Sequence, residues 1–562
     1  MSKGGRELSR RMNLFSKQYR NLSASKREQE KGEEVMATTQ VEVNSGTKKH
    51  IKSLREYIDV LKDLGELQEI NQEVDPHLEI GAIARRCYET CAPAALFNNI
   101  KGVTPGFRVL GAPIGVSRQE GLYMSRVAVS LGLDPRATGQ EMIRALVEAR
   151  RLKGIPPKRV ATGPCKENKK FGDEVDLLSL QAPLLHDGDG GRYFNTLGMV
   201  VVQTPDKKWT NWSIARIMLL DKNRMVGLVW PLQHIQGVHQ AWKDIGKDMP
   251  FALVQGCEPF MPFVCGMPLP PTFDTTVWPP RVRPPFVSEA DYVGAYFGEG
   301  VEVVKCETSD LEVPATAEIV IEGTLSITET AHEGPMGEYA GYFGEHNIFT
   351  ERADDHWPVY HVTALTHRNN PILPVSVAGE PVEEDHTACG IPSAAETMVQ
   401  LQDNGIPVTM VWTPFASANH WCVVTVPRNW RDTMNCTAED FCRKIGQIIL
   451  ASKLGPQVAK MMVINDDIDP TNLQELVWGF ATRCHPGEGE IVLRHQILSP
   501  LIGFGTKSER LTLDGPKSVY NCLRPEDYGS EMQKRSSFRY AYPKELQEKV
   551  IANWRSYGFT HP

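Results

Sequence analysis

An arginine ends a strand-like run near the middle of the chain, Thr210-Asn-Trp-Ser-Ile-Ala-Arg216. A guanidinium placed among apolar residues needs an anionic partner, and its planar fork suits a carboxylate or a phosphate. Arg216 could therefore hold an acidic ligand. From the residues alone, an exposed arginine on an edge strand is the simpler interpretation.

A second polar position follows the mostly apolar segment 225–232, where Gln233 precedes His234. An imidazole can bind a metal or carry a proton near neutral pH. A single histidine after a strand more often makes only a structural hydrogen bond, so this position also has two interpretations.

The third position is the run Glu333-Gly-Pro-Met-Gly-Glu338. Two carboxylates on either side of a Gly/Pro turn can converge on one cleft, where they drive each other's pKa apart as acid–base catalysis requires. Spacing alone favours a solvated turn in which the two acids never meet.

The first elements that could position these groups are helices near the N-terminus. Apolar residues recur at helical spacing from Ile51 to Leu61, and Gly65 follows as a stop signal. A capping box at 138–141 predicts another helix that runs to Leu152. The polar stretch 155–175 then predicts an interdomain link.

From about residue 190 to 380 the pattern changes to period two with β-branched runs, which predicts a β-rich region. The predicted strands are 195–204, 209–220, 225–230, 301–306, 318–327, 359–366 and 372–377. The segment 268–285 holds seven prolines in eighteen residues. Such a segment cannot be a regular helix or a central strand, so it predicts a surface insertion.

Beyond residue 390 helices and strands alternate, which predicts an α/β unit. Capping signals place helix starts at 393–396 and 437–440, and strands are predicted at 406–412, 421–426 and 461–464. A last amphipathic helix follows Pro543 and is expected to dock on a partner subunit or on the chain itself. The domain prediction is a basic leader without fixed structure at 1–50, an N-terminal α/β region at 51–165, a β-rich domain at 166–380 and a C-terminal α/β domain at 381–562.

Composition narrows the class of protein. The 562 residues are 41% hydrophobic and 23% charged, which is typical of globular chains. The net charge of −8 excludes a general polyanion binder, and so a nucleic-acid partner is not expected. Twelve scattered cysteines indicate free thiols in a reducing compartment, and no apolar run reaches the roughly 18 residues of a membrane span.

The charge is distributed unevenly. Residues 1–50 contain 11 Lys or Arg and six Asp or Glu, a net +5, which leaves −13 for the rest. The leader could be a mitochondrial presequence, but its acidic residues favour a solvated tail and a cytoplasmic protein. Met36 offers a second start, so the first 35 residues need not belong to every form of the chain.

Several motifs in one order resemble the UbiD-like family of decarboxylases, and within it the fungal ferulic (cinnamic) acid decarboxylases. They are TNWSIAR (210–216), Gln233-His234, VSEADYVGA around Glu289, the segment 303–326, EGPMGEYAGY (333–342) and NDDID (465–469). The resemblance spans roughly residues 50–560. It implies an α/β (α+β) fold with an N-terminal α/β region, a central split β-barrel that binds flavin, and a C-terminal α/β dimerisation domain.

The resemblance also implies a cofactor, prenylated FMN. By position, Asn211, His234 and Glu289 would hold Mn²⁺ or Mg²⁺ against the flavin phosphate, and such a mixed O/N donor set suits these ions. Lys453 would contact the phosphate. Further cofactor contacts would come from Trp212, Ser213, Ile214, Ala215, Arg216 and Gln233, and the neighbourhood of a potassium ion from Trp212, Cys265, Met267, Glu289 and Arg483.

The same resemblance implies a catalytic set of Arg216, Glu333 and Glu338. Arg216 would fix the substrate carboxylate, Glu333 would orient Arg216, and Glu338 would protonate the carbon left after loss of CO₂. Asn211 and Arg216 are five residues apart, so one regular strand would point them to opposite faces. A bulge, or a flavin that wraps the strand, is needed to reconcile them.

Trp230, with Pro231, and Cys389 depart from the family pattern where the substrate pocket is expected, and Cys265 stands where a serine would be expected. The expected reaction is therefore the non-oxidative decarboxylation of a cinnamic, hydroxybenzoic or heteroaromatic acid. A flavin prenyltransferase would supply the cofactor, and the chain would form a homodimer. The alternatives are a flavin-binding or maturation protein without turnover, and a metal-dependent hydrolase for which further ligands are missing from the sequence.

Overall fold

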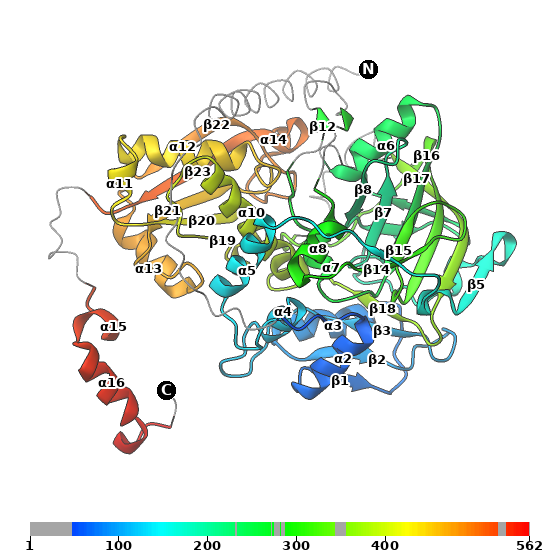
Figure 1. The fold of residues 1–562 in the computed structure, drawn as a ribbon, viewed down its shortest axis with the longest axis horizontal. Helices are drawn as coiled ribbons and strands as arrows, with labels where there is room; N and C mark the ends of the chain where they lie inside the picture. Colours follow the sequence, from blue (N-terminus) through cyan, green and yellow to red (C-terminus); the bar gives the residue numbers. More distant parts are fainter. Residues whose placement is uncertain are drawn as a thin grey trace.

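The computed structural model describes residues 48–230, 233–270, 273–274, 281–282, 287–342, 356–525 and 535–560. The basic leader thus lies almost wholly outside the described residues. Of the proline-rich insertion, the structure describes residues 268–270 and a short antiparallel pair, β12 (Phe273–Asp274) and β13 (Arg281–Val282). Figure 1 shows the rest as three parts: a blue N-terminal part, a green sheet-rich part and a yellow to orange C-terminal part.

The N-terminal part is a four-stranded sheet in the order β1 (Leu67–Ile70), β2 (Ala94–Phe97), β3 (Arg108–Gly111) and β18 (Ile372–Val375). Its helices are α2 (Leu54–Asp63), α3 (Glu79–Glu89) and α4 (Ser125–Ser130). The first helix begins at Leu54 rather than Ile51, because the Ser53 side chain accepts from the Glu56 N–H and caps it. Strand β18 pairs parallel with β3, although the pattern had assigned 372–377 to the middle region. The sequence of a short strand that is buried on both faces is apolar throughout, so it does not indicate which sheet the strand joins.

The middle part is a nine-stranded antiparallel sheet. Its path runs β6 (Tyr193–Asn195), β9 (Ile217–Leu219), β10 (Arg224–Gly227), β17 (His356–His367), β16 (Ile319–His332), β11 (Met249–Gln255), β7 (Met199–Gln203) and β8 (Thr210–Ser213), with β5 (Asn168–Phe171) added on β17. Strands β8 and β9 lie toward opposite ends of this path, yet only residues 214–216 separate them in the chain. The sheet therefore curls until its two ends approach each other, which confirms the predicted barrel-like middle part.

Both faces of the curled sheet are covered. In β7, Met199 and Val201 pack in one hydrophobic core while Val200 and Val202 pack in another. This is the period of two expected when a strand is buried on both sides. It explains why the sequence reads as a nearly continuous apolar run there, and why β11, which the pattern missed, is almost fully buried.

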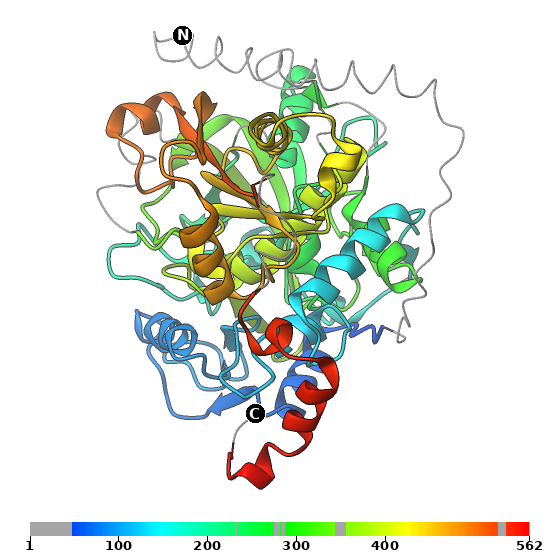
Figure 2. The same ribbon diagram turned by 90° about the vertical axis from the view of Figure 1, so that its left-hand side faces the viewer.

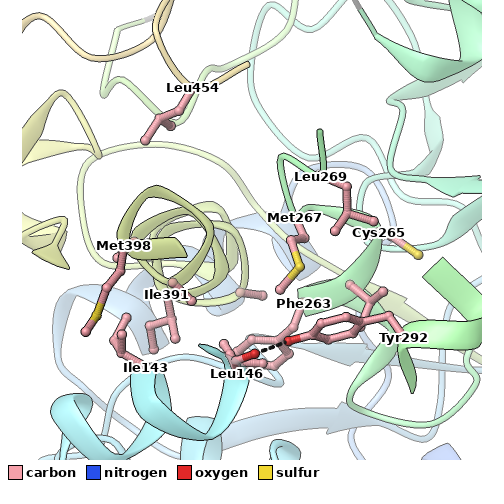
Figure 3. Packing of buried hydrophobic residues seen from close by; sticks show 14 of the residues in the cluster. Ile143, Leu146, Phe263, Cys265, Met267, Leu269, Tyr292, Ile391, Met398 and Leu454 are labelled. Carbon is pink, nitrogen blue, oxygen red and sulfur yellow. Dashed lines mark hydrogen bonds between the residues drawn. The ribbon is translucent and has the colours of Figure 1, made fainter. Parts of the chain in front are cut away.

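Helices and a small sheet surround the curled sheet. They are α6 (His234–Asp244), α7 (Met261–Cys265), α8 (Glu289–Phe297) and the sheet β15 (Glu312–Pro314), β14 (Glu302–Lys305) and β4 (Lys158–Arg159). Helix α5 (Gly139–Arg151) has the predicted capping box at Thr138 and Glu141. Its Ile143 and Leu146 face α10 (Gly390–Asp403), and the Tyr292 hydroxyl donates to the Leu146 carbonyl (Figure 3). This core joins the middle part to the C-terminal part.

The C-terminal part is a five-stranded sheet in the order β19 (Met410–Trp412), β20 (Trp421–Val426), β21 (Lys460–Asn465), β23 (Asp514–Cys522) and β22 (Glu490–Ile497). Its helices are α10, α11 (Trp430–Thr433), α12 (Ala438–Leu450), α13 (Leu473–Arg483) and α14 (Lys507–Thr512). Helix α12 starts after its predicted cap, Thr437. Helix α10 was expected to start at Ser393, but it begins at Gly390 after a π-helical turn, Asp385–Cys389. Ser393 is buried inside the helix, so its capping pattern was misleading.

The chain ends in α15 (Phe538–Ala541) and α16 (Lys544–Ala552), which confirms the helix predicted after Pro543. Neither helix has a buried residue. The Tyr540 hydroxyl of α15 donates to the Asp467 carbonyl at 3.4 Å, whereas α16 lies apart from the rest of the chain in Figure 1. Figure 2 shows the same red arm leaving the orange C-terminal part. None of the helices in the described residues is both long and apolar enough to cross a membrane.

Candidate functional site

The three residues that join β8 to β9, Ile214–Arg216, line the cavity of the candidate site. The strand is interrupted at Ile214–Arg216, so Asn211 lies in β8 whereas Arg216 directly precedes β9, a strand toward the opposite end of the curled sheet. Buried Asn195 holds this junction, because its Nδ2 donates to the Ala215 carbonyl at 2.6 Å. Its Oδ1 accepts from Gly198 N at 2.7 Å and from the fully buried Gln255. Because the two residues are not on one regular strand, their spacing of five residues no longer requires their side chains to point to opposite faces.

Arg216 contacts both predicted glutamates. Its Nε and Nη2 lie 2.9 and 3.0 Å from the two oxygens of Glu333, and its Nη1 donates to Glu338. The Glu333 side chain is fully buried, and Tyr193 donates its hydroxyl to Glu333 at 2.6 Å. Burial opposes the charge of Arg216, but the two carboxylates hold its pKa well above the ordinary value. The interpretations of an exposed arginine and a solvated acidic turn are thus both wrong.

Glu338 is the member of this set that faces a cavity. Its side chain is 12% exposed, whereas that of Glu333 is not exposed at all. Burial raises the pKa of Glu338, Arg216 opposes the rise, and Glu333 and Asp189 add to it. A carboxyl whose pKa is raised keeps its proton to a higher pH, which is the property that a general acid needs.

A second buried group lies at the start of two helices. Asn211 of β8, His234 of α6 and Glu289 of α8 are each at most 2% exposed. Asn211 Nδ2 lies 3.0 Å from Glu289 Oε1 and 3.4 Å from His234 Nδ1, and the latter two atoms are 3.5 Å apart. Burial, and then the charge of Lys453, lower the pKa of His234 to about 4, so the imidazole is neutral at pH 7. A neutral imidazole is the form that binds metal ions.

The chemistry of this trio fits a cation. Asn211 Oδ1 is buried and has no hydrogen-bond partner among the described residues. The two ends of an amide have the same shape, so exchanging them would aim Oδ1 at the point between His234 and Glu289. The trio contains only two residues of the His, Cys, Asp and Glu type. That agrees with the finding that no group of three such residues suited to a metal occurs in the described part of the chain.

A cavity of about 390 Å³ connects the two groups. This volume lies in the range of cofactor sites. Arg216, Glu338, His234 and Lys453 all line it. Burial lowers the pKa of Lys453 to about 8, against the opposing charges of Glu289 and Glu396. Near neutral pH the cavity therefore holds a lysine cation beside the trio and a guanidinium at Arg216.

Most of the other predicted site residues belong to the same cavity. Its lining includes Ser213, Ile214, Ala215, Gln233, Cys265 and Met267, and also Trp230 and Cys389. Trp212 does not line it, but its backbone N–H donates to Glu289 Oε2 at 3.1 Å. Arg483 is not among the lining residues. Its guanidinium makes two hydrogen bonds to Asp467, at 3.0 and 2.6 Å, so the structure does not bring it to this wall.

Some functional residues carry no signal in the sequence. Tyr193 and Asn195 lie in the short buried strand β6, and only the fold shows that they support Glu333 and the 214–216 junction. Asp385 and Asn419 also line the cavity, on a π-helical turn and on a loop. Hydrophobic periodicity does not predict which residues on irregular backbone line a site.

Comparison with known proteins gives matches along most of the chain. Profiles described as the 3-octaprenyl-4-hydroxybenzoate carboxy-lyase N-terminal, Rift-related and C-terminal domains match residues 58–146, 158–381 and 386–522. The chain is 40% identical over 506 residues to a pyrrole-2-carboxylic acid decarboxylase of Pseudomonas aeruginosa, and 40% identical over 512 residues to ferulic acid decarboxylase 1 of Saccharomyces cerevisiae. Each alignment covers 90% of this chain and 98% of the relative.

Solved structures share the fold. A vanillic acid decarboxylase of Sedimentibacter hydroxybenzoicus in a closed form aligns with a TM-score of 0.73 at 23% identity, covering 90% of this chain and 99% of that one. The UbiD-class enzyme HmfF of Pelotomaculum thermopropionicum, an evolved dimeric form in complex with prFMN, aligns with a TM-score of 0.68 at 23% identity. That alignment covers 89% of this chain and 99% of the other.

Proposed function

Because the chain belongs to the UbiD family of carboxy-lyases, we propose that its cavity binds prenylated FMN and that the enzyme decarboxylates an aromatic or α,β-unsaturated carboxylic acid without net oxidation. One observation carries this proposal. At the wall of the 390 Å³ cavity, Arg216 lies between a fully buried Glu333 and a cavity-facing Glu338. The guanidinium can bind a substrate carboxylate, and the neighbouring carboxyl with a raised pKa can protonate the carbon that CO₂ leaves.

The polar groups at the other end of the cavity suit the flavin phosphate. The unpartnered Asn211 Oδ1, the neutral His234 and the Glu289 carboxylate would hold Mn²⁺ or Mg²⁺, and Lys453 would neutralise phosphate charge. The hydroxyl of Ser213, which also lines the cavity, is buried and has no hydrogen-bond partner among the described residues. When bound, prenylated FMN supplies the electron sink for breaking the bond to CO₂.

Arg216 binds and orients the substrate carboxylate. Glu333 occupies its Nε and Nη2 from the buried side, which leaves Nη1 directed at Glu338 and the cavity. A substrate carboxylate would replace Glu338 as the anionic partner at this atom. Ionised substrate and ionised Glu338 would repel each other there, so substrate binding favours the protonated form of Glu338.

Glu338 then delivers its proton to the substrate carbon from which CO₂ has left. Its position beside Arg216 places the acid next to the departing carboxylate, and burial raises the pKa of this acid. The negative charge left on Glu338 is met by Arg216, which has just lost its carboxylate partner. One ion pair replaces another, so the site never holds an unpaired buried charge.

The cavity walls point to a flat, unsaturated acid. Trp230 and Trp357 line it with ring centroids 6.3 Å apart, and Tyr339 and Cys389 add further surface. Aromatic faces favour planar ligands. Cinnamic, ferulic, hydroxybenzoic and heteroaromatic acids all remain candidates, and the relatives named after ferulic and pyrrole-2-carboxylic acids represent two of these groups.

The test is CO₂ release from a panel of these acids by the chain expressed together with a flavin prenyltransferase. We expect turnover of at least one acid, and loss of nearly all turnover in Glu338→Gln with flavin binding retained. Glu329→Gln is a matched control, since Glu329 is a half-exposed glutamate of β16 paired with Arg224 and His361. Absence of turnover by protein with verified cofactor would instead support a flavin-binding or maturation protein.

Three further features belong to the same proposal. Cys265, Met267, Trp212 and Glu289 would form the neighbourhood of a potassium ion without Arg483, and metal analysis of the purified protein tests both ions. The exposed arm α15–α16 would complete a homodimer, since its apolar residues Leu546 and Ile551 are 42% and 65% exposed. Deletion of the arm should then yield monomers in light scattering. The enzyme would act in the cytoplasm, which fractionation of native cells tests.

A further inference from the structure

A loop outside the predicted catalytic set braces the segment that carries Glu338. The loop is residues 186–190, and it lies against Gly334–Gly337. Gly190 N donates to the Pro335 carbonyl at 2.7 Å, and Gly337 N donates to Asp189 Oδ1 at 3.1 Å. Two hydrogen bonds therefore connect this loop to the backbone immediately before Glu338.

The packing between the two segments is too close for side chains. A Cβ built on Gly190 would lie 1.9 Å from the Gly334 carbonyl oxygen, and a Cβ on Gly337 would lie 2.8 Å from the His186 ring. Both positions must therefore be glycine for residues 186–190 and 334–337 to lie this close together. The segment before Glu338 is thus held from one side by backbone contact.

Asp189 is the centre of the brace. Its side chain is fully buried. Its second oxygen accepts from His186 N at 3.0 Å and lies 3.1 Å from His186 Nδ1. The other ring nitrogen of His186 lies 2.9 Å from the carbonyl of Ala378, a residue that lines the cavity. The histidine therefore connects Asp189 to a residue that lines the cavity, and this contact restrains the Asp189 side chain.

We propose that Asp189, held by His186, is a positioning residue of the reaction: it fixes the peptide before Glu338 and places a second buried negative charge beside the proton donor. The role of Glu338 as proton donor rests on the proposed function above. The charge of Asp189 does not, because it acts on Glu338 whether or not substrate is turned over. A purely structural aspartate would hold the loop and leave the protonation of Glu338 unchanged.

Several charged or titratable groups face Glu338. They are Arg216 from the 214–216 junction, Glu333 from the preceding turn, Asp189 from the brace, Asp385 from the π-helical turn and the neighbouring Tyr339. Burial raises the pKa of Glu338 most, Arg216 lowers it, and Glu333 and Asp189 raise it. Removal of the Asp189 charge should therefore lower this pKa while the other groups stay in place.

The experiment is an infrared titration of the full-length, flavin-loaded protein without substrate. The carbonyl band of the protonated Glu338 carboxyl is assigned by its loss in Glu338→Gln. In Asp189→Asn, which keeps an oxygen for Gly337 N but loses the charge, the midpoint should fall by about one pH unit. Asp187→Asn is the matched control, since Asp187 is an exposed carboxylate of the same loop, and its midpoint should not move.

Turnover provides the second readout. The rate falls as pH rises through the pKa of Glu338, because the acid must hold its proton, so this fall should begin about one pH unit lower in D189N. Asp189→Glu keeps the charge but misplaces the Gly337 contact, so it should lower kcat and leave the midpoint unchanged. If D189N does not fold, Asp189→Ser removes the same charge. An identical infrared midpoint in the charge-free variant and the wild type overturns the proposal, whereas a shifted midpoint in a protein that turns over no acid overturns only the proposed function.

Discussion

The hydroxyl of Tyr193 offers a direct measure of how strongly Glu333 orients Arg216. Tyrosine and glutamate are both fully buried, and the O–H donates to Glu333 Oε1 at 2.6 Å. A hydrogen bond to a charged group contributes about 1.5–3 kcal/mol. Tyr193→Phe removes it without leaving a cavity. Glu333 keeps its contacts to Arg216, so we expect the lower end of that range, about 1.5 kcal/mol or a little more than a tenfold loss of kcat/KM.

The assay is a double-mutant cycle on kcat/KM with Tyr193→Phe and Glu333→Gln. If the hydroxyl acts through Glu333, the second substitution should cost much less once the first is present, with a coupling of about 1 kcal/mol or more. Tyr360→Phe is the control, because Tyr360 is also fully buried and its hydroxyl has no hydrogen-bond partner among the described residues. Equal effects of the two tyrosine substitutions, or additivity in the cycle, would refute the reasoning.

Two further predictions concern buried titratable groups outside the proposed catalytic set. Lys517 is 1% exposed and donates to two backbone carbonyls of the loop that follows Lys453. Lys517→Met should loosen that loop and weaken FMN binding about tenfold in a fluorescence titration, a loss of about 1.4 kcal/mol. Unchanged affinity for FMN would assign Lys517 a purely structural role. Burial raises the pKa of Glu384 to about 7, so folding takes up a proton and stability falls as pH rises from about 4.5 to 7. Glu384→Gln removes this pH dependence while keeping an acceptor for Ile114 N. In denaturant titrations, the free energy of unfolding of the variant should therefore rise relative to that of the wild type by up to about 3 kcal/mol between pH 5 and pH 8. Parallel curves of unfolding free energy against pH would contradict this prediction.

The sequence contained enough to predict the α/β classes of the fold and the residues Arg216, Glu333 and Glu338, which the structure brings together. Period-two runs indicated the curled sheet, and capping residues located α5 and α12 at their first turns. The prediction was wrong where a local signal competed with packing. Ser393 resembles a cap but lies inside α10, and strand 372–375 belongs to a sheet built mainly from residues 67–111. Local patterns describe which face of an element is apolar, not which partner covers it.

The support of the site was beyond prediction for a related reason. Tyr193 and Asp189 act through contacts with residues roughly 140 positions away in the chain. No spacing rule connects such positions, because the connection exists only when the curled sheet and the 186–190 loop have formed. Arg216, Glu333 and Glu338 were found through the family motifs that carry them, because their types and spacing alone favoured an exposed arginine and a solvated turn. Their partners are ordinary tyrosine and aspartate residues until the fold places them.

The junction between β8 and β9 explains how one short segment serves both ends of the cavity. An uninterrupted strand would have turned Asn211 and Arg216 to opposite faces, since their spacing is odd. The break at residues 214–216 releases that constraint, and closure of the sheet brings its two ends together at the same point. The amide then joins His234 and Glu289 while the guanidinium meets Glu333 and Glu338. The groups proposed to hold a cation and a carboxylate are thereby set a few residues apart, which requires the irregular backbone that strand periodicity alone would have excluded.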